Sequence, residues 1–558
     1  MALDIARVFA VLTLFAVVSP GTLHAQGGAP TRQELDPAGR SQRLAPPAPD
    51  LFSNPGAGAC PLAENPAPLT VRSVTLRGLV SVPAAELQST FADLVNKPGD
   101  AADLCKIRDR VAEALFDRGL LARVEIPAQT IDDGAVTLEV VEAHIVNVTV
   151  RGDPGAAGPL LEQYAQRLRG MAPFDVNQVQ RYILLASDVP GLSVRATVRP
   201  NTDGQRGAVD LDLNVEHNPQ DLTVNIQNAQ ARTTGRFGGL LRYDFNARTR
   251  FGEQTSVVLY RTLRDEQWVL QGVEEIRLGS EGLMLRGSLA YGESHPGDVL
   301  KPLGIKSKSL VASVEANYPL IRKRRLNVRA AAGLELINQD TGAAGSRLIN
   351  DDLRVVYARV AGDRTSYWGG IHPVTVSGQA TLRQGVTVLG ATDQGDRLLS
   401  RGDARPGTWV AAVEARAFTL ISPRLSLQAG INGQYADRPL TAYEEYAVGP
   451  FSIGRGYDPA YVSGDRALAA SVEAHSGPFT PRSGWAFSPY AFFDIAHVQN
   501  LDRGGGHDTV KSVGAGFQIP LRDRWVMDAA YARPLDRRAF DRKRPSGRLL
   551  MSLTARFY

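Results

Sequence analysis

The sequence predicts two small α+β units followed by an all-β, 16-stranded transmembrane barrel. One order of elements, a strand, two helices and two strands, occurs twice between residues 69 and 218. Beyond residue 219 the helical spacing stops, and segments of 9–12 residues alternate apolar with polar side chains. With 558 residues the chain is also too long for one ordinary core, so several domains are expected.

The composition excludes several classes of protein. Lys+Arg is 62 and Asp+Glu is 58, and this near balance gives no support to a nucleic-acid-binding protein. Hydrophobic residues make up 43% and the mean hydropathy is −0.16, which is typical neither of a disordered chain nor of a helical membrane protein. The only two cysteines, Cys60 and Cys105, exclude a disulfide-dense scaffold and a Cys-rich metal site.

Residues 1–25 are typical of a secretory signal peptide. Arg7 precedes an eleven-residue apolar run at 8–18, and Ala25 offers a small residue at the cleavage site. Because that run is too short to cross about 30 Å of hydrocarbon as a helix, a membrane anchor is the weaker interpretation. Export to an oxidising compartment favours a disulfide between Cys60 and Cys105 over two free thiols.

Residues 26–68 form an N-terminal segment before the first folded unit. They are rich in Pro, Ala and Gly, which predicts a flexible linker. Within this segment, residues 31–43 are polar enough for a short helix, although Pro37 and Gly39 argue against a long one.

The two repeated units span residues 69–143 and 144–218. In the first unit we expect strands at 69–77, 122–126 and 135–141, and helices at 83–95 and 101–118. In the second unit we expect strands at 145–151, 192–198 and 208–215, and helices at 159–169 and 176–186. Each unit then buries two amphipathic helices on one face of a sheet.

The region 219–558 predicts sixteen amphipathic strands. They are expected at about 222–231, 237–247, 254–263, 267–277, 283–292, 309–318, 326–337, 351–361, 365–377, 407–419, 424–435, 467–476, 486–496, 511–519, 524–533 and 547–558. Connections after even-numbered strands are mostly short, whereas several after odd-numbered strands are long. This arrangement is typical of an outer-membrane barrel, in which a closed sheet pairs every backbone group within lipid. The alternative, a pair of soluble sandwiches, normally has shorter strands and no such sorting of loops.

The candidate site lies in the loop 436–466. It contains Gly454-Arg455-Gly456-Tyr457, and a later strand contains Phe492 and Asp494 on one face. An arginine between glycines can enter a narrow space, so an inward-folded loop can place Arg455 on Asp494 if that acid faces the lumen. The alternative is an ordinary solvent-exposed hairpin tip, and spacing alone leaves both interpretations open.

The sequence contains no recognisable catalytic constellation. The Gly-x-Ser-x-Gly nucleophile motif is absent, and the eight histidines do not show His-Glu-x-x-His spacing. We expect His475 and His497 to be lumen or interface residues. The predicted protein is therefore not an enzyme and needs no cofactor or metal.

These features together resemble the Omp85 superfamily, and most closely its two-partner-secretion branch, the TpsB transporters of the haemolysin-activator and filamentous-haemagglutinin type. The stretch 462–466 and the cysteine pair that brackets the first unit are also similar to that branch. The resemblance implies that the two units are POTRA domains and that Asp494 is the wall partner of the loop motif. Gly454 stands where the family usually has an aliphatic residue, and we expect this departure to loosen the loop.

The resemblance also implies a function. POTRA domains in the periplasm would recognise a large, unfolded TpsA-type exoprotein of the haemagglutinin, haemolysin or adhesin kind, and the barrel pore would secrete it. A plug helix inside the barrel would correspond to residues 31–43. Alternatives are an Omp85-type outer-membrane assembly factor, which generally has more POTRA units, and a passive porin, which has no use for them.

Further partners follow from an outer-membrane location. They are outer-membrane lipid and lipopolysaccharide and, during biogenesis, the barrel-assembly machinery; no nucleic acid is expected. The chain ends in Phe557-Tyr558, an aromatic terminus of the kind that this machinery reads. Strand parity places Phe557 on the lipid face and Tyr558 at the rim of the wall.

Overall fold

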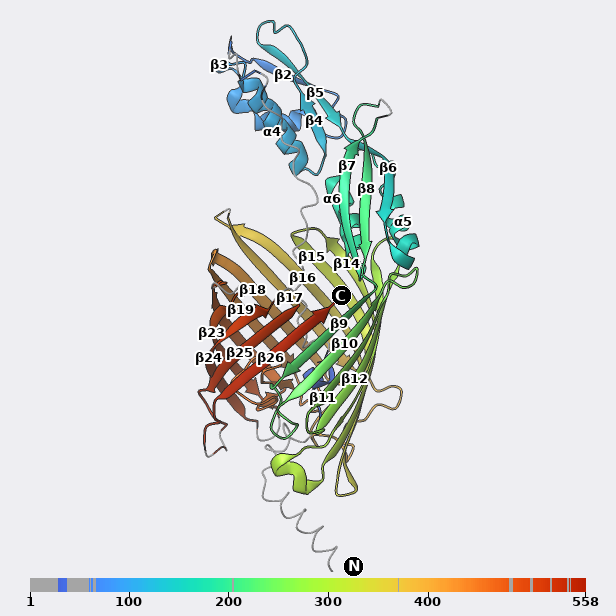
Figure 1. Cartoon of the computed structure of the whole chain (residues 1–558), viewed down its shortest axis with the longest axis vertical. Coiled ribbons are helices and arrows are strands. Elements are labelled where there is room, and N and C mark those ends of the chain that lie inside the picture. The colour runs from blue at the N-terminus through green and yellow to red at the C-terminus, as the bar shows by residue number, and fades with distance from the viewer. Residues whose placement is uncertain are drawn as a thin grey trace, which may run out of the picture.

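The computed structural model describes residues 29–37, 60, 62–63, 67–202, 205–369, 371–480, 485–501, 505–521, 524–538, 541 and 543–558. Two small α/β units follow one another above one end of a closed barrel (Figure 1). The predicted signal peptide and most of the predicted linker lie outside the described residues. Among the described residues, every helix is too short or too polar to cross a membrane.

The first unit has a three-stranded sheet in the order β2-β5-β4, with β2 parallel to β5. Its elements are β2 (Ser73–Arg77), η2 (Ala84–Thr90), η3 (Ala92–Leu94), α4 (Asp103–Asp117), β4 (Ala122–Glu125) and β5 (Ala135–Glu142). A short ladder of β1 (Pro68–Leu69) and β3 (Gly99–Asp100) lies beside it. Leu87, Ile107 and Leu138 are fully buried in its core. A disulfide joins Cys60, which precedes the unit, to Cys105 of α4.

The predicted helix at 83–95 is wrong in type. The structure has two 3₁₀ segments there, η2 and η3, separated by Phe91. Phe91 has a φ of −130°, which is outside the helical range, and its side chain is 3% exposed. Packing of this ring into the core therefore interrupts the helix that the spacing predicted.

The second unit agrees closely with the sequence expectation. It contains β6 (His144–Gly152), η4 (Gly155–Ala157), α5 (Gly158–Gln166), α6 (Val176–Ser187), β7 (Leu192–Pro200) and β8 (Ala208–His217), with sheet order β6-β8-β7. Asp175 caps α6, because its carboxylate accepts hydrogen bonds from the backbone N–H groups of Asn177 and Gln178. Both helices bury apolar side chains, including Leu161 and Ile183, against the sheet.

The barrel consists of sixteen antiparallel strands, as predicted, and closes where β26 pairs with β9. The strands are β9 (Gln220–Gln227), β10 (Gly238–Asn246), β11 (Gln254–Thr262), β12 (Gln267–Leu278), β13 (Leu283–Ser294), β14 (Lys306–Arg322), β15 (Leu326–Ala343), β16 (Ser346–Trp368), β17 (His372–Gly385), β18 (Trp409–Ser422), β19 (Leu425–Ala436), β22 (Arg466–Ser476), β23 (Ser488–Gln499), β24 (His507–Leu521), β25 (Trp525–Pro534) and β26 (Arg548–Phe557). The remaining pair, β20 (Tyr446–Ala447) and β21 (Ser463–Gly464), lies within the loop that follows β19.

One predicted turn is wrong. The predicted strands at 351–361 and 365–377 leave a turn at residues 362–364, but in the structure β16 continues to Trp368. Gly362 pairs with Val328 on one side and with Gly378 on the other, so its backbone groups lie in a continuous ladder. Pairing continues past Gly362 on both sides, to Arg364 with β15 and to Trp368 with β17, and overrides the local turn preference of a glycine followed by an aspartate.

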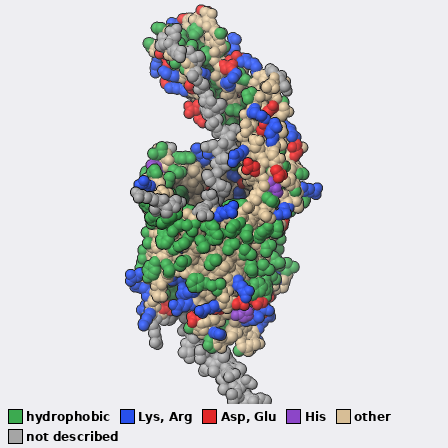
Figure 2. Space-filling model, in the orientation of Figure 1, with side chains coloured by type: hydrophobic (Ala, Val, Ile, Leu, Met, Phe, Trp, Pro, Cys, Tyr) green, Lys and Arg blue, Asp and Glu red, His purple; other side chains and the backbone are tan. Residues whose placement is uncertain are grey.

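The barrel wall has an apolar outer face. Figure 2 shows a band of hydrophobic side chains across the side of the barrel that faces the viewer. Along β24, Val513 and Phe517 point outward and are 40% and 38% exposed, whereas Ser512 is fully buried on the inner side. At the end of the chain, the Phe557 ring meets Trp525 at 6.0 Å, and Tyr558 follows the last strand and is exposed.

The second unit is attached directly to the short-turn end of the barrel. The Arg322 guanidinium donates two hydrogen bonds to the Asp188 carboxylate, both at 2.7 Å. The Tyr182 hydroxyl donates to Glu281 at 3.1 Å, and Glu281 lies in the turn before β13. The units therefore lie at one mouth of the barrel, and the long loops lie at the opposite mouth (Figure 1).

Candidate functional site

The loop between β19 and β22, residues 437–465, folds into the barrel and brings Arg455 to Asp494 on β23. The Arg455 side chain donates from Nη2 to Oδ1 at 2.8 Å and from Nε to Oδ2 at 3.1 Å. Its backbone N–H also donates to Oδ2 at 2.9 Å. Asp494 is 1% exposed, so this is a buried, two-point charge pair rather than a solvent-exposed hairpin tip.

Neighbouring strands complete the environment of Arg455. Nη2 donates to the Ser471 hydroxyl at 3.0 Å, and Nη1 donates to the Glu473 carboxylate. The guanidinium carbon lies 3.6 Å from the centre of the Phe492 ring, in a cation–π contact. One cation therefore faces two carboxylates and an aromatic ring from β22 and β23. Removing one member of such a set typically costs about 3–5 kcal/mol.

The two glycines beside Arg455 permit this close approach. A Cβ on Gly456 would lie 2.6 Å from the Cβ of Ser512, which is too close for any side chain. Gly454 has a φ of +131°, and a Cβ there would lie 2.6 Å from Val448. Gly454 is thus tightly packed in the folded loop, and its effect on the looseness of the loop stays a prediction.

Tyr457 anchors the far side of the motif. It is 1% exposed, and its hydroxyl donates to the carbonyl of Lys511 at 2.7 Å. The same hydroxyl accepts a hydrogen bond from the backbone N–H of Asp536 at 3.1 Å. The motif is therefore held from both ends, by β23 through Arg455 and by the loop after β25 through Tyr457.

Sequence reasoning missed two members of this site, Glu473 and Arg548. Arg548 donates to the carbonyl of Tyr457 and to the carbonyls of Ala229 and Gln230, both at 3.0 Å. It therefore ties the motif to the seam where the last strand meets the first. The signal that could have found both residues is strand parity, because each is a charged residue on the face opposite the lipid-facing side chains.

A short N-terminal segment, residues 29–37, occupies part of the lumen (Figure 1). It contains α2 (Arg32–Leu35), which begins with a capping box in which Thr31 and Glu34 exchange hydrogen bonds. Leu35 is 3% exposed. It packs in an apolar cluster of lumen residues: Leu240, Val258, Tyr260, Val269, Ile337, Leu353, Val355 and Tyr443.

The predicted helix at 31–43 is one turn long in the described residues. It ends at Leu35, and Asp36 has non-helical angles because a following proline disfavours the helical region. Residues 38–43 lie outside the described part of the chain. Polar contacts hold this segment to the wall, including a 3.0 Å hydrogen bond from Gln339 to the carbonyl of Pro30.

Replacing Leu35 with aspartate is expected to release this segment, because the substitution places an unpaired carboxylate in an apolar cluster. The ionic conductance of the purified protein in planar lipid bilayers should rise several-fold. The matched control is Asp36→Asn, since Asp36 is exposed and an asparagine can still accept the hydrogen bond from Gln271. An unchanged conductance in the Leu35→Asp protein would contradict a plugging role.

His475 and His497, the two histidines named from the sequence, both lie on strands of the barrel. His475 stacks on Tyr490 inside the barrel at 5.0 Å, next to Glu473. His497 bonds to Thr509 at 2.8 Å and lies near His507 at 5.6 Å. Within the described ranges, His, Cys, Asp and Glu form no group that could hold a metal ion.

Comparisons with known proteins agree with this architecture. The heme/hemopexin transporter protein HuxB of Haemophilus influenzae is 20% identical over 503 residues, which cover 84% of each chain. CdiB from Escherichia coli has a similar structure, with a TM-score of 0.72, 16% identity and coverage of 97% of this chain and 99% of that one. CdiB from Acinetobacter baumannii gives a TM-score of 0.65 at 14% identity, with the same coverage.

The family models are more specific than these structural likenesses, which show the fold. The model for haemolysin secretion/activation protein ShlB/FhaC/HecB matches residues 207–519, and the model for the ShlB-type POTRA domain matches residues 69–143. The first match alone covers more than half of the chain. The chain therefore belongs to the ShlB/FhaC/HecB family of two-partner-secretion transporters in the Omp85 superfamily, whose barrel lies in the Gram-negative outer membrane with its POTRA domains in the periplasm.

Proposed function

We propose that this protein captures a large, unfolded exoprotein in the periplasm and secretes it through its barrel. The observation that carries the proposal is the position of two sheet-containing units at one mouth of a closed barrel whose lumen contains the segment 29–37 and the inward loop 437–465. Membership in a family of secretion transporters implies a secreted partner. Recognition of that partner by the POTRA domains and its passage through the barrel are what we propose here.

Capture is proposed to use the edges of the POTRA sheets. The outer strands are β2 and β4 in the first unit and β6 and β7 in the second. Each such strand has one side that is not paired within its sheet, and an extended chain can add to it by β-augmentation. This mode suits an unfolded client because main-chain hydrogen bonds provide affinity without requiring a particular sequence.

Passage is proposed to require rearrangement of the inward loop around Arg455. The motif is anchored on the inner side of the neighbouring strands β22, β23 and β24, and we propose that it narrows the path of a translocating chain. The pair with Asp494 would hold the loop in place between transport events. Because the periplasm has no nucleotide supply, progressive folding of the exoprotein outside the cell would bias its movement outward.

The test is export of a defined partner. A large exoprotein with a β-helical N-terminal domain, sought in the reading frames beside this one, should appear in the culture medium when it is expressed with this chain and remain in the periplasm without it. A passive porin would instead increase solute uptake with no effect on that exoprotein. An assembly factor would change the levels of other outer-membrane proteins when it is deleted, and either result would contradict the proposal.

A further inference from the structure

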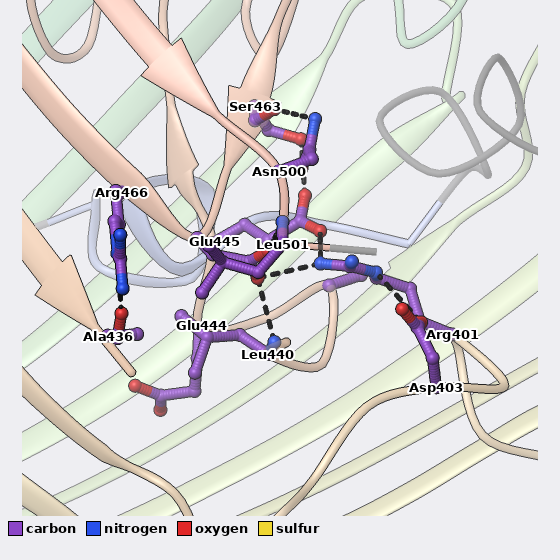
Figure 3. A network of polar contacts seen from close by, with 12 residues as sticks. Arg401, Asp403, Ala436, Leu440, Glu444, Glu445, Ser463, Arg466, Asn500 and Leu501 are labelled. Carbon is purple, nitrogen blue, oxygen red and sulfur yellow. Dashed lines mark hydrogen bonds and ion pairs between the residues drawn. The ribbon is translucent and has the colours of Figure 1, made fainter. Parts of the chain in front are cut away.

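Asp465 joins three segments at the long-loop mouth of the barrel. It belongs to the stretch 462–466, which is similar to the two-partner-secretion branch, and its side chain is fully buried. Its Oδ1 atom accepts a hydrogen bond from the backbone N–H of Leu440, and its Oδ2 atom accepts one from the backbone N–H of Leu501, both at 2.7 Å. Leu440 lies in the same loop, 437–465, whereas Leu501 lies just after β23 (Figure 3).

The third segment is the loop 386–408, which contributes Arg401. Nη1 of Arg401 donates to Oδ1 of Asp465 at 2.7 Å and to Oε1 of Glu445 at 2.8 Å. Nε lies 3.6 Å from Asp403 of its own loop. Ser463 also donates to Glu445, so both arms of the loop 437–465 meet at this point (Figure 3).

The guanidinium of Arg401 balances the negative charges of Glu445 and Asp465 in this cluster. Arg401, Glu445 and Asp465 have side chains that are 2%, 3% and 0% exposed, so one buried cation lies against two buried carboxylates. Without the guanidinium, the two carboxylates would repel one another in a poorly solvated site. In addition, Nη2 of Arg401 is buried with no hydrogen-bond partner, so the cluster is not fully satisfied.

The cluster is separate from the site around Arg455. The contacts of Arg455 are with β22 and β23, whereas Arg401 contacts loop residues and Asp465, which directly precedes β22. A second contact between the same two loops accompanies it, because the backbone N–H of Ala442 donates to the Ser400 hydroxyl at 3.0 Å. The loop 386–408 is therefore held against the loop 437–465 by contacts that do not involve Arg455.

We propose that Arg401, Asp465 and Glu445 form a latch that closes the extracellular mouth and opens as an exported chain passes. The latch holds the loop 386–408 against the loop 437–465, and Asp465 fixes the position of both. Opening exchanges contacts within the cluster for water. This inference rests on the proposed secretion function, although closure of the mouth can be measured without any cargo.

The first test measures closure alone. Leu440, which is 2% exposed, is replaced with cysteine, and intact cells are treated with a membrane-impermeant maleimide. The native cysteines do not interfere, because they are joined in a disulfide. Arg401→Gln and Asp465→Asn are each expected to raise the labelling rate about tenfold or more, since both break the charge pair. The matched control is Arg397→Gln, an exposed arginine of the same loop, which should leave the rate unchanged.

Folding is checked on the same samples by the heat-dependent gel mobility of barrel proteins. Equal labelling of the Arg401→Gln and Arg397→Gln proteins, both folded, would overturn the latch. Where Arg401→Gln fails to assemble, Asp465→Asn gives the same comparison, because it keeps the shape of the side chain and removes its charge. Neither result depends on whether the exoprotein is secreted, so failure of the latch is distinguishable from failure of the secretion proposal.

The second test asks whether the latch opens during export. Ser400→Cys and Ala442→Cys are combined in one protein for cross-linking, because the Ser400 hydroxyl lies 3.0 Å from the backbone nitrogen of Ala442. The cross-linked protein is expected to lose export and to regain it after mild reduction, whereas Ala442→Cys alone, which keeps the backbone N–H of this contact, exports normally. Wild-type protein treated with the same reductant controls for reduction of the native disulfide. Full export through the cross-linked barrel would show that the latch stays closed and would overturn the proposal.

Discussion

The Arg455→Ala protein is expected to export less than about one-tenth of the wild-type amount of exoprotein while its barrel still assembles. The substitution leaves the buried carboxylate of Asp494 without its two-point partner and leaves Glu473 without its cation. The loop 437–465 then loses its charged attachment to β22 and β23, and we expect the released loop to obstruct the lumen. Exoprotein in the medium, measured by immunoblot against the periplasmic fraction, gives the export efficiency.

Two further variants make this result specific. Arg455→Lys keeps the charge but lacks the planar fork that reaches both oxygens of Asp494, so we expect intermediate export. Arg438→Ala removes an exposed arginine of the same loop, which pairs only with its neighbour Asp437 at 3.5 Å among the described contacts, and should export normally. Near-normal export by Arg455→Ala would rule out the inward-loop mechanism.

Deletion of residues 69–143 is expected to abolish export while leaving a conducting pore. The deleted unit has its own core and its own sheet, so its removal does not disturb packing in the barrel. The second unit keeps its attachment through Arg322 and Asp188. Cys60 is replaced with serine in the same variant, because its disulfide partner Cys105 is deleted.

Two measurements on this variant separate capture from transport. Its conductance in planar bilayers should match that of the full chain, which establishes that the barrel has assembled. Its exoprotein should accumulate in the periplasm or be degraded there. Continued export by the deletion protein would remove the docking role that we assign to the first unit.

The strand pattern could be predicted because its cause is local. A residue in the wall faces either lipid or the lumen, so each strand must alternate, as Val513 and Ser512 do on β24. The errors arose where a neighbour overrode local preference. Gly362 lies within a strand because β15 and β17 both pair with it. Phe91 interrupts a predicted helix because its ring packs into the core of the first unit.

The inward loop could be predicted only in part. The glycines beside Arg455 indicated a close approach, and the parity of Asp494 placed that acid on a defined face of its strand. Neither feature could distinguish a loop folded into the lumen from an exposed tip. That choice depends on Tyr457 and Ser471 finding partners on strands and loops that are distant in the sequence.

By itself, the sequence determined the repeated order of strands and helical segments in the two units and the number of barrel strands, because the period of apolar residues acts over a few residues. Only the tertiary structure decided that Arg548 and Arg401 matter. Strand parity gives the face on which Arg548 lies, but no local pattern shows what the guanidinium of Arg548 or Arg401 contacts. The role of each arginine arises when barrel closure brings carbonyls and carboxylates from separate loops around one guanidinium and excludes water from them.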